Sequence, residues 1–424
     1  MDDPLDIQIP GLRLATDVRE GGQAVVLRGT DGEGRELAIK VARPERWAKE
    51  SLLREIAALE RIHASDHESE HWLVELVSSG ALPDGRPYMV LPWFPHSLLT
   101  WLTVEEPPMV ARFDALVQAC AAVARLHSSG ALHEVTVHRD LKPGNFLVRQ
   151  GEDLQVRLAD LGGVKARTFR ERTSNTVMFT PTYAPLEQRL PLERPLDSSV
   201  DVHALGVMVF QVLTGELPET ALNRSGYRLP ATAELQALED SREALPPDKE
   251  ARFQFLAKQP LSTFYDLDAA PDMLDSDINM LKNALNQGIS ADAASKVAEV
   301  LIPALERAIR ADPDRRESSA RELLGACIVG RAQAGAAPST ALDRLVAPVL
   351  GKGAARARTI KPGTKRKRKL IPLVLVSMAV GGVLALGALW WMWPRSVALG
   401  ADEAAALGMD VQLAPARISV QYTG

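Results

Sequence analysis

The chain has 424 residues but only two cysteines, Cys120 and Cys327. Both lie in segments with helical patterning, and their separation matches neither a metal-ligand pair nor a redox pair. The pattern favours buried, reduced thiols and suits a reducing cytosol. Internal repeats are also absent, and the hydrophobic content of 46% is ample for a core. Composition therefore favours two or three ordinary domains over a disulfide-stapled scaffold.

A general excess of positive charge is absent as well. The formal net charge is −5, yet nine basic residues and no acids lie between Lys352 and Lys369. That run contributes +9, which leaves −14 for the rest of the chain. An acidic body argues against nucleic-acid binding as the main activity. We therefore expect no nucleic-acid partner.

One apolar run is long. Residues 371–393 carry no charge, five consecutive basic residues lie just before them, and three tryptophans lie at their far end. A bilayer-spanning helix needs about 20 apolar residues, whereas a buried core helix of that length normally shows a polar face. Basic residues stay cytoplasmic and tryptophans favour the interface. We predict a single transmembrane helix at 371–393 and a short extracytoplasmic tail at 394–424; the alternative is a buried helix. The acidic N-terminus lacks the apolar core of a signal peptide.

The most informative segment is His138–Asn145, which reads His-Arg-Asp-Leu-Lys-Pro-Gly-Asn. It resembles the catalytic loop of protein kinases. In phosphoryl transfer from ATP, catalysis rests on positioning the attacking hydroxyl and neutralising charge. The resemblance implies that Asp140 orients the hydroxyl and accepts its proton, and that Lys142 balances charge on the γ-phosphate. Asn145 would offer an oxygen to magnesium or manganese, since hard cations prefer oxygen ligands.

Three further residues appear along the sequence in the order in which protein kinases carry their equivalents. Lys40 ends an alternating apolar segment that predicts a strand, and it resembles the lysine that kinases place on the ATP phosphates. Glu55 lies on a predicted helix, from which its carboxylate would hold Lys40 in place. The alternative for Glu55 alone is an ordinary surface glutamate. Asp160, in Asp-Leu-Gly, resembles the metal-binding acid of the family.

Residues with structural roles in the family follow. The segment Thr180–Glu187 looks like the end of a kinase activation segment. Thr180 would help to hold Asp140 and Lys142. Asp201 resembles the acid that braces the catalytic loop, and Arg316 resembles the arginine that pairs with Glu187. Solvated loop positions are the alternative for these charged residues.

The glycine-rich loop of the family is poorly represented. Kinases usually show G-x-G-x-x-G-x-V, because glycine lets backbone amides approach the phosphates. Here Gly21 aligns with a motif glycine, whereas Arg19 and Ala24 occupy the flanking positions. A turn between two strands explains Gly21 and Gly22 equally well. The loop is consistent with ATP binding but does not indicate it, and nucleotide affinity would suffer.

The same resemblance places the adenine site after the strand-like run at residues 88–91. Leu91 would guard the back of the pocket, the carbonyl of Pro92 would accept from the adenine amino group, and the amide of Phe94 would donate to the ring. Proline is tolerated there because only its carbonyl is used. The alternative is a core strand followed by a turn.

These observations predict an α+β, bilobal protein-kinase fold over residues 11–329, with a small β-rich lobe and a large helical lobe. A basic, flexible juxtamembrane linker is expected at 330–370, followed by the membrane span and tail. Two departures from the family are extra residues at 131–137 and a long insertion within 218–311. We interpret the insertion as surface padding, with partner recognition as the alternative.

The chain resembles the Hanks-type serine/threonine kinases of bacteria over roughly its first three quarters. The resemblance implies an ATP-dependent kinase that acts on protein serine and threonine hydroxyls. It would be anchored in the inner membrane with the kinase domain in the cytoplasm. The alternative is a catalytically weak pseudokinase that acts as a membrane signalling scaffold. A receptor role for the tail is disfavoured, because about thirty residues without cysteine are too few for a folded sensor.

Small residues in the predicted span are compatible with a homodimer; the alternative is that they only reflect the ordinary abundance of small residues in membrane helices. Ser377, Gly381 and Ala385 recur at four-residue spacing, which would let a second membrane helix approach closely. Paired kinase domains would phosphorylate each other, and Arg139 would bind the new phosphate. The expected acceptors lie between Asp160 and Glu187, and they are Thr173, Ser174 and Thr176.

Overall fold

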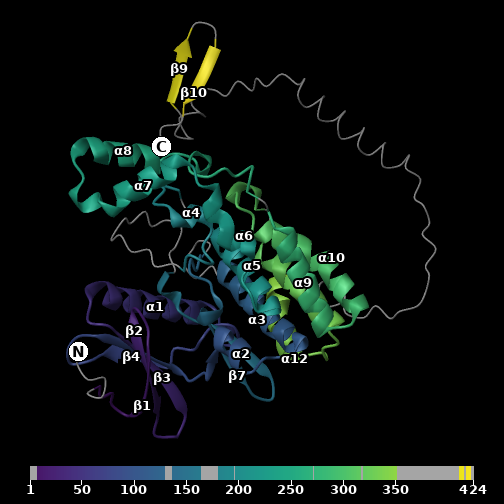
Figure 1. Cartoon of the computed structure of the whole chain (residues 1–424). Helices are drawn as coiled ribbons and strands as arrows, with labels where there is room; N and C mark the ends of the chain where they lie inside the picture. The colour runs from purple at the N-terminus through teal and green to yellow at the C-terminus, as the bar shows by residue number, and fades with distance from the viewer. Residues whose placement is uncertain are drawn as a thin grey trace. The chain divides into compact units, whose positions relative to one another are not determined.

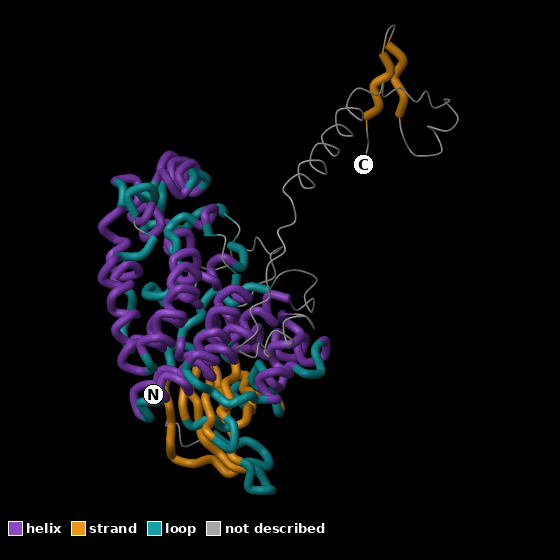
Figure 2. The backbone as a smooth tube through the Cα atoms, turned by 90° about the vertical axis from the view of Figure 1, so that its right-hand side faces the viewer, coloured by secondary structure: helices purple, strands orange, loops and turns teal. Residues whose placement is uncertain are grey.

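A computed structural model describes residues 7–128, 136–163, 180–194, 196–270, 272–316, 319–350, 410–414 and 417–421. The chain divides into two units, Met1–Thr359 and Ile360–Gly424, and each is described by itself. In the first unit the strands gather at one end and helices form most of the remainder (Figure 2). These two parts are the small and large lobes predicted from the sequence.

The small lobe is a five-stranded antiparallel sheet with the order β1-β2-β3-β5-β4. Its strands are β1 (Arg13–Glu20), β2 (Ala24–Thr30), β3 (Glu36–Ala42), β4 (Ser78–Ala81) and β5 (Pro87–Pro92). Alternation along β3 sends Leu37, Ile39 and Val41 into one buried cluster. Ala38 and Lys40 therefore point from the opposite face, and Lys40 pairs in register with Val26 of β2.

Helix α1 (Arg46–Ser65) lies beside this sheet (Figure 1). Its buried stripe includes Leu52, Ile56, Leu59 and Ile62, which recur at helical spacing. Glu55 lies within the same stripe and is 3% exposed. The helix therefore carries this carboxylate to the inner side of the lobe.

The large lobe is built on two helices that are buried almost throughout, α3 (Met109–Ser128) and α5 (Ser199–Thr214). A short antiparallel sheet of β6 (His96–Ser97), β7 (Phe146–Gln150) and β8 (Leu154–Leu158) lies beside them. The other helices are α2 (Leu98–Val104), α4 (Leu186–Arg189), α6 (Glu219–Leu222), α7 (Pro230–Asp240), α8 (Pro247–Ala257), α9 (Asp275–Gly288), α10 (Ala291–Ala308), α11 (Ala320–Gln333) and α12 (Thr340–Leu350). Most of them share one continuous apolar core with α1.

The insertion predicted within 218–311 folds as part of this lobe. Its helices α7 and α8 form a hairpin around a second apolar cluster, which includes Leu235, Phe253 and Phe264. Leu186 and Leu190, at the end of the predicted activation segment, belong to the same cluster. The insertion thus packs against the end of that segment through shared apolar contacts. The other predicted departure, residues 131–137, lies mostly outside the described residues.

The flexible linker predicted to begin at residue 330 is wrong for its first part. Helix α11 continues to Gln333, and α12 packs against α3. Leu342, Leu345, Val346 and Val349 are buried at helical spacing. The Ala-rich and Gly-rich composition suggested a flexible chain, but this apolar periodicity makes the segment helical. Residues 351–370 lie outside the described residues.

Among the residues that the structure describes, no helix is long and apolar enough to cross a membrane. The predicted span at 371–393 lies outside those residues. In the second unit, β9 (Asp410–Ala414) and β10 (Arg417–Gln421) form an antiparallel hairpin.

Candidate active site

Asp140 lies at the centre of a small polar network. Its Oδ2 accepts from Lys142 Nζ at 2.7 Å. Its Oδ1 accepts from the backbone N–H of Thr180 at 2.9 Å and from the Thr180 hydroxyl at 3.0 Å. Lys142 Nζ also donates to that hydroxyl at 2.9 Å. Thr180 therefore holds both side chains, as the sequence resemblance implied.

The catalytic loop is held from behind by Asp201, which is fully buried at the start of α5. Its carboxylate accepts from the backbone N–H groups of His138 at 2.7 Å and Arg139 at 2.8 Å. His127 Nε2 lies 2.9 Å from the same carboxylate. These bonds fix a loop in which Arg139 has a positive φ of 71°. Sequence reasoning singled out Asp201 but not His127.

Lys40, Glu55 and Asp160 meet at the inner side of the small lobe. Lys40 Nζ lies 2.7 Å from Glu55 and 3.3 Å from Asp160. Burial, opposed in part by Lys40, raises the pKa of Glu55 to about 7. The charge of Lys40 lowers the pKa of Asp160 despite burial. Burial alone would lower the pKa of Lys40, but Asp160 and Glu55 raise it. Lys40 is therefore charged and lies between two acids.

The residues that the sequence predicts as metal ligands are Asp160 and Asn145. Asn145 Nδ2 donates to the carbonyl of Asp140 at 2.7 Å, which leaves its amide oxygen as the atom for a cation. No group of three or more histidines, cysteines or acids among the described residues forms a metal cluster. One carboxylate and one amide suit magnesium, which usually completes its coordination with substrate phosphates and water. These two residues therefore fit such an ion.

The glycine-poor loop forms the turn between β1 and β2. Gly21 N–H donates to the carbonyl of Ala24 at 2.9 Å. Arg43 donates to the carbonyl of Gly21 at 2.9 Å, and Ser51 of α1 donates to Gln23 at 2.8 Å. The turn that the sequence allowed at Gly21 and Gly22 is thus present. It is tied to α1 by a side-chain bond.

The predicted adenine contacts Leu91, Pro92 and Phe94 lie at the end of β5 and just beyond it. Trp93 N–H donates to the carbonyl of Glu36 at 3.1 Å. Arg149 of β7 donates to the carbonyl of Trp93 and stacks over Phe94, 4.4 Å from the ring centroid. Residues 92–95, which connect β5 of the small lobe to β6 of the large lobe and are called the hinge below, are therefore tied to both lobes.

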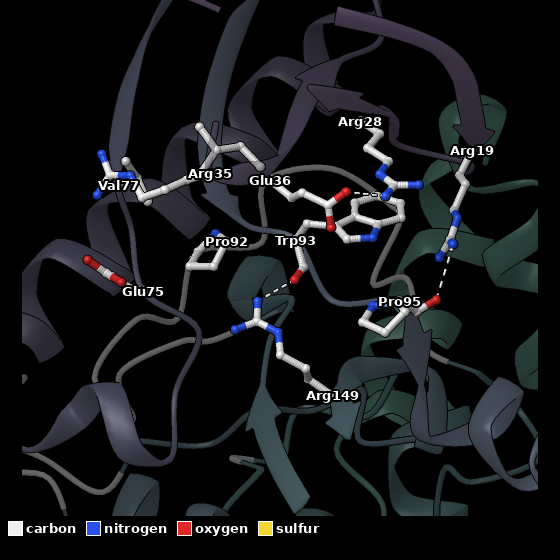
Figure 3. A pocket seen from close by; sticks show the side chains of 11 residues that line it. Arg19, Arg28, Arg35, Glu36, Glu75, Val77, Pro92, Trp93, Pro95 and Arg149 are labelled. Atoms are coloured by element: carbon white, nitrogen blue, oxygen red, sulfur yellow. Dashed lines mark hydrogen bonds and ion pairs between the residues drawn. The ribbon is translucent and has the colours of Figure 1, made fainter. Parts of the chain in front are cut away.

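A cavity of about 700 Å³ opens beside this hinge (Figure 3). Arg19 and Arg28 lie over the indole of Trp93, 4.7 and 5.1 Å from the ring centroid. Arg19 also donates to the carbonyl of Pro95 at 3.2 Å, so it links β1 to the hinge. The residues that line the cavity are Arg19, Arg28, Arg35, Glu36, Leu37, Glu75, Val77, Pro92, Trp93, Pro95 and Arg149. Sequence reasoning missed this arrangement; an arginine in a glycine position was the only signal.

The activation segment is described only at its end. Arg316 donates to Glu187 at 2.7 Å, and both side chains are buried, in agreement with the pairing expected from the sequence. The predicted acceptors Thr173, Ser174 and Thr176 lie outside the described residues. The structure thus brings together the predicted residues of both lobes but does not describe the acceptor region.

Comparison with known proteins agrees with this geometry. The protein kinase domain family matches residues 14–325. Serine/threonine-protein kinase Pkn1 of Myxococcus xanthus is 31% identical over 223 residues, which are 51% of this chain and 31% of that protein. PknL of Mycobacterium tuberculosis is 31% identical over 239 residues, covering 54% of this chain and 57% of PknL. RqkA of Deinococcus radiodurans, a DNA damage-responsive serine/threonine-protein kinase, is 33% identical over 210 residues, which are 47% of this chain and 29% of RqkA.

The chain spans between 29% and 57% of the length of these three curated relatives. Among solved structures, a chain of the CAK complex of Chaetomium thermophilum bound to ATP-gamma-S has a TM-score of 0.48 and 19% identity, covering 74% of this chain and 90% of that one. That likeness is too remote to bear on function. The match of the protein kinase domain to about three quarters of the sequence is decisive, and the chain belongs to the protein kinase family.

Proposed function

We propose that this chain is an ATP-dependent serine/threonine protein kinase. The observation that carries the proposal is the network of Asp140, Lys142 and Thr180. It holds an acid and an ammonium where a hydroxyl must lose its proton and a phosphoryl group must be neutralised. The kinase relatives in bacteria support serine and threonine as acceptors.

Each residue has a separate task in this proposal. Asp140 orients the substrate hydroxyl and takes its proton, while Lys142 balances the γ-phosphate. Lys40, held by Glu55, binds the α- and β-phosphates. A magnesium or manganese ion held by Asn145 and Asp160 would neutralise charge on the phosphates. The substrates are proteins, and ATP is the phosphoryl donor.

The test is transfer by the full chain. Purified protein is incubated with ATP, magnesium and a generic protein substrate, and phosphoserine and phosphothreonine are identified by mass spectrometry. An Asp140→Asn variant is the matched control, because it preserves size and removes the proton acceptor. We expect phosphorylation by the wild type alone. Binding of ATP without transfer by the wild type would favour the scaffold alternative.

We also propose that residues 371–393 anchor the chain in the inner membrane with the kinase domain cytoplasmic. The support is the uncharged run with its basic and tryptophan flanks. A reporter that is active only outside the cytoplasm should function when fused after Gly424. A variant carrying Val380→Arg and Leu384→Arg should lose membrane association, because charge at the bilayer centre is costly. Cytoplasmic reporter activity alone would contradict this orientation.

Autophosphorylation within a homodimer is the finest part of the proposal. Arg139 is mostly buried beside Asp140, and its Nε has no hydrogen-bond partner among the described residues. That guanidinium would suit a phosphate on Thr173, Ser174 or Thr176. Gly381→Ile should then lower phosphorylation of these residues in membranes at native expression. Unchanged phosphorylation would mean that this helix face does not drive pairing.

A further inference from the structure

His203 lies on α5, two residues after Asp201, and is fully buried. Its Nδ1 is 3.0 Å from the backbone carbonyl of Tyr183, at the end of the activation segment. A carbonyl oxygen only accepts hydrogen bonds, so Nδ1 carries the proton. The imidazole of His203 on α5 therefore donates a hydrogen bond to the backbone of the activation segment.

The second ring nitrogen of His203, Nε2, contacts Arg224, which belongs to the insertion. Arg224 Nη1 lies 2.6 Å from His203 Nε2. A guanidinium only donates, so Nε2 is the acceptor and the imidazole is neutral. Burial, with Arg224 and Arg316 nearby, lowers the pKa of His203 well below its usual value. Both sides of the ring are thus used, and its tautomer is fixed.

Arg224 is itself an unusual buried cation, only 1% exposed. It donates to His203 and to the carbonyl of Ile309, and its Nε has no hydrogen-bond partner among the described residues. Burial lowers its pKa to about 9. Burying a charge without a hydrogen-bonded acid is costly, because the charge loses its hydration without a compensating ion pair. Surface padding does not require such a residue.

The bonds continue from Tyr183 to the catalytic acid. Tyr183 N–H donates to the carbonyl of Thr180 at 3.0 Å, and Thr180 donates to Asp140. Tyr183 is also tied to α5 through its hydroxyl, which donates to Gln211 at 2.6 Å. A continuous chain of hydrogen bonds therefore joins Arg224 to Asp140.

We propose that Arg224 and His203 are positioning residues, through which the insertion braces the end of the activation segment and holds Thr180 against Asp140. This inference rests on the proposed kinase function for its kinetic consequence, but the brace itself is a structural claim. It replaces our interpretation of the insertion as padding. Neither residue contacts the reacting atoms, so both act through Tyr183 and Thr180.

The test compares Arg224→Met with Arg252→Met in the full chain. Arg252 belongs to the same insertion but lies at the surface, where it binds Glu234 and stacks over Phe255, away from His203. Amide hydrogen exchange is measured by mass spectrometry without substrate. We expect faster exchange at residues 180–190 in Arg224→Met, with α3 and α9 unchanged. Wild-type exchange there, or a uniform increase throughout the large lobe, would overturn the brace.

Kinetics provide the second readout. Arg224→Met should lower kcat by about tenfold, as small misplacements of catalytic groups do, while the KM for ATP stays within about twofold. His203→Gln keeps a donor and an acceptor and should retain more activity than His203→Leu. Equal loss in these two His203 variants, or a parallel rise in the KM for ATP, would overturn positioning. If the wild type transfers no phosphate, the kinase proposal fails, and exchange alone decides the brace.

Discussion

The two walls of the nucleotide site differ in how closely they follow the family pattern. On the large-lobe side, Asp140 and Lys142 share the hydroxyl of Thr180, and the buried Asp201 holds the loop that carries them. On the small-lobe side, Arg19 stands in a glycine position and reaches across to the hinge. The residues proposed to carry out transfer are all present and in contact, whereas the loop proposed to cover the nucleotide departs from the family pattern.

This difference has a physical reason. Proton acceptance and charge neutralisation depend on particular side chains held in one geometry, so a substitution there removes the chemistry. The glycine-rich loop acts mainly through backbone amides, which other residues also possess. Changes to the loop therefore alter affinity while the chemical step survives. We expect the proposed kinase to combine an ordinary rate of phosphoryl transfer with weakened ATP binding.

The largest effect should come from Asp140. Asp140→Asn removes the proton acceptor, and we expect kcat to fall by about 10²-fold to 10⁴-fold with ATP binding nearly intact. Asp160→Asn should also weaken magnesium-dependent ATP binding, because Asp160 belongs to the metal site. Transfer rates and calorimetric titration with and without magnesium separate the two. Full transfer by both variants would contradict the enzyme proposal. The contrast drawn between the two walls would then also be wrong.

A smaller effect is expected at Thr180. Thr180→Val removes a hydroxyl that bonds two charged groups, and bonds of this kind are worth about 1.5–3 kcal/mol. We expect kcat to fall by about tenfold to a hundredfold, whereas Thr180→Ser should be nearly normal. Thr182→Val is the matched control in the same turn. Normal kcat in Thr180→Val would show that Asp140 and Lys142 hold their geometry without it.

Much of the large-lobe wall could be predicted from sequence, because the catalytic loop is one short motif and the family resemblance supplied the roles of Thr180 and Asp201. Asp140, Lys142 and Asn145 lie within six residues, so any fold that forms the loop brings them together. The His203 and Arg224 contact could not be predicted, because it joins residues 21 positions apart through a buried surface that carries no motif. Helix α12 was missed for another reason: its composition was given more weight than its apolar spacing.

The third prediction concerns pH and the ion pair between Lys40 and Glu55 in the small lobe. Burial raises the pKa of Glu55 to about 7, so Glu55 gains a proton as the pH falls through that value. Lys40 then loses a charged partner, and kcat/KM for ATP should fall by up to about tenfold per pH unit. Glu55→Gln should be slower at pH 8 and lack this acidic limb. Glu50→Gln, on the same helix but paired with Arg46 at the surface, is the control.

The same shift affects stability with a definite sign. The folded pKa of Glu55 lies above the unfolded value, so the folded state binds the proton more tightly. Its contribution to the free energy of unfolding is fully present below about pH 4.5 and is lost as the pH rises through 7. Urea unfolding of the wild type and Glu55→Gln between these pH values measures the contribution of Glu55 to the free energy of unfolding. An identical pH dependence in the two proteins would contradict the shift.

The smallest effect is expected at Arg19, where the small-lobe wall departs from the family. Arg19→Gly removes the link to Pro95 and the stacking on Trp93, and it lets the backbone approach the phosphates. We expect the KM for ATP to fall by about threefold to tenfold, while kcat stays within about twofold. Arg19→Ala separates loss of the side chain from gain of a glycine. Arg35→Ala is the control, because Arg35 lines the same cavity but pairs with Asp31. A rise in KM would show instead that Arg19 binds the nucleotide, and the two walls would then be equally adapted to it.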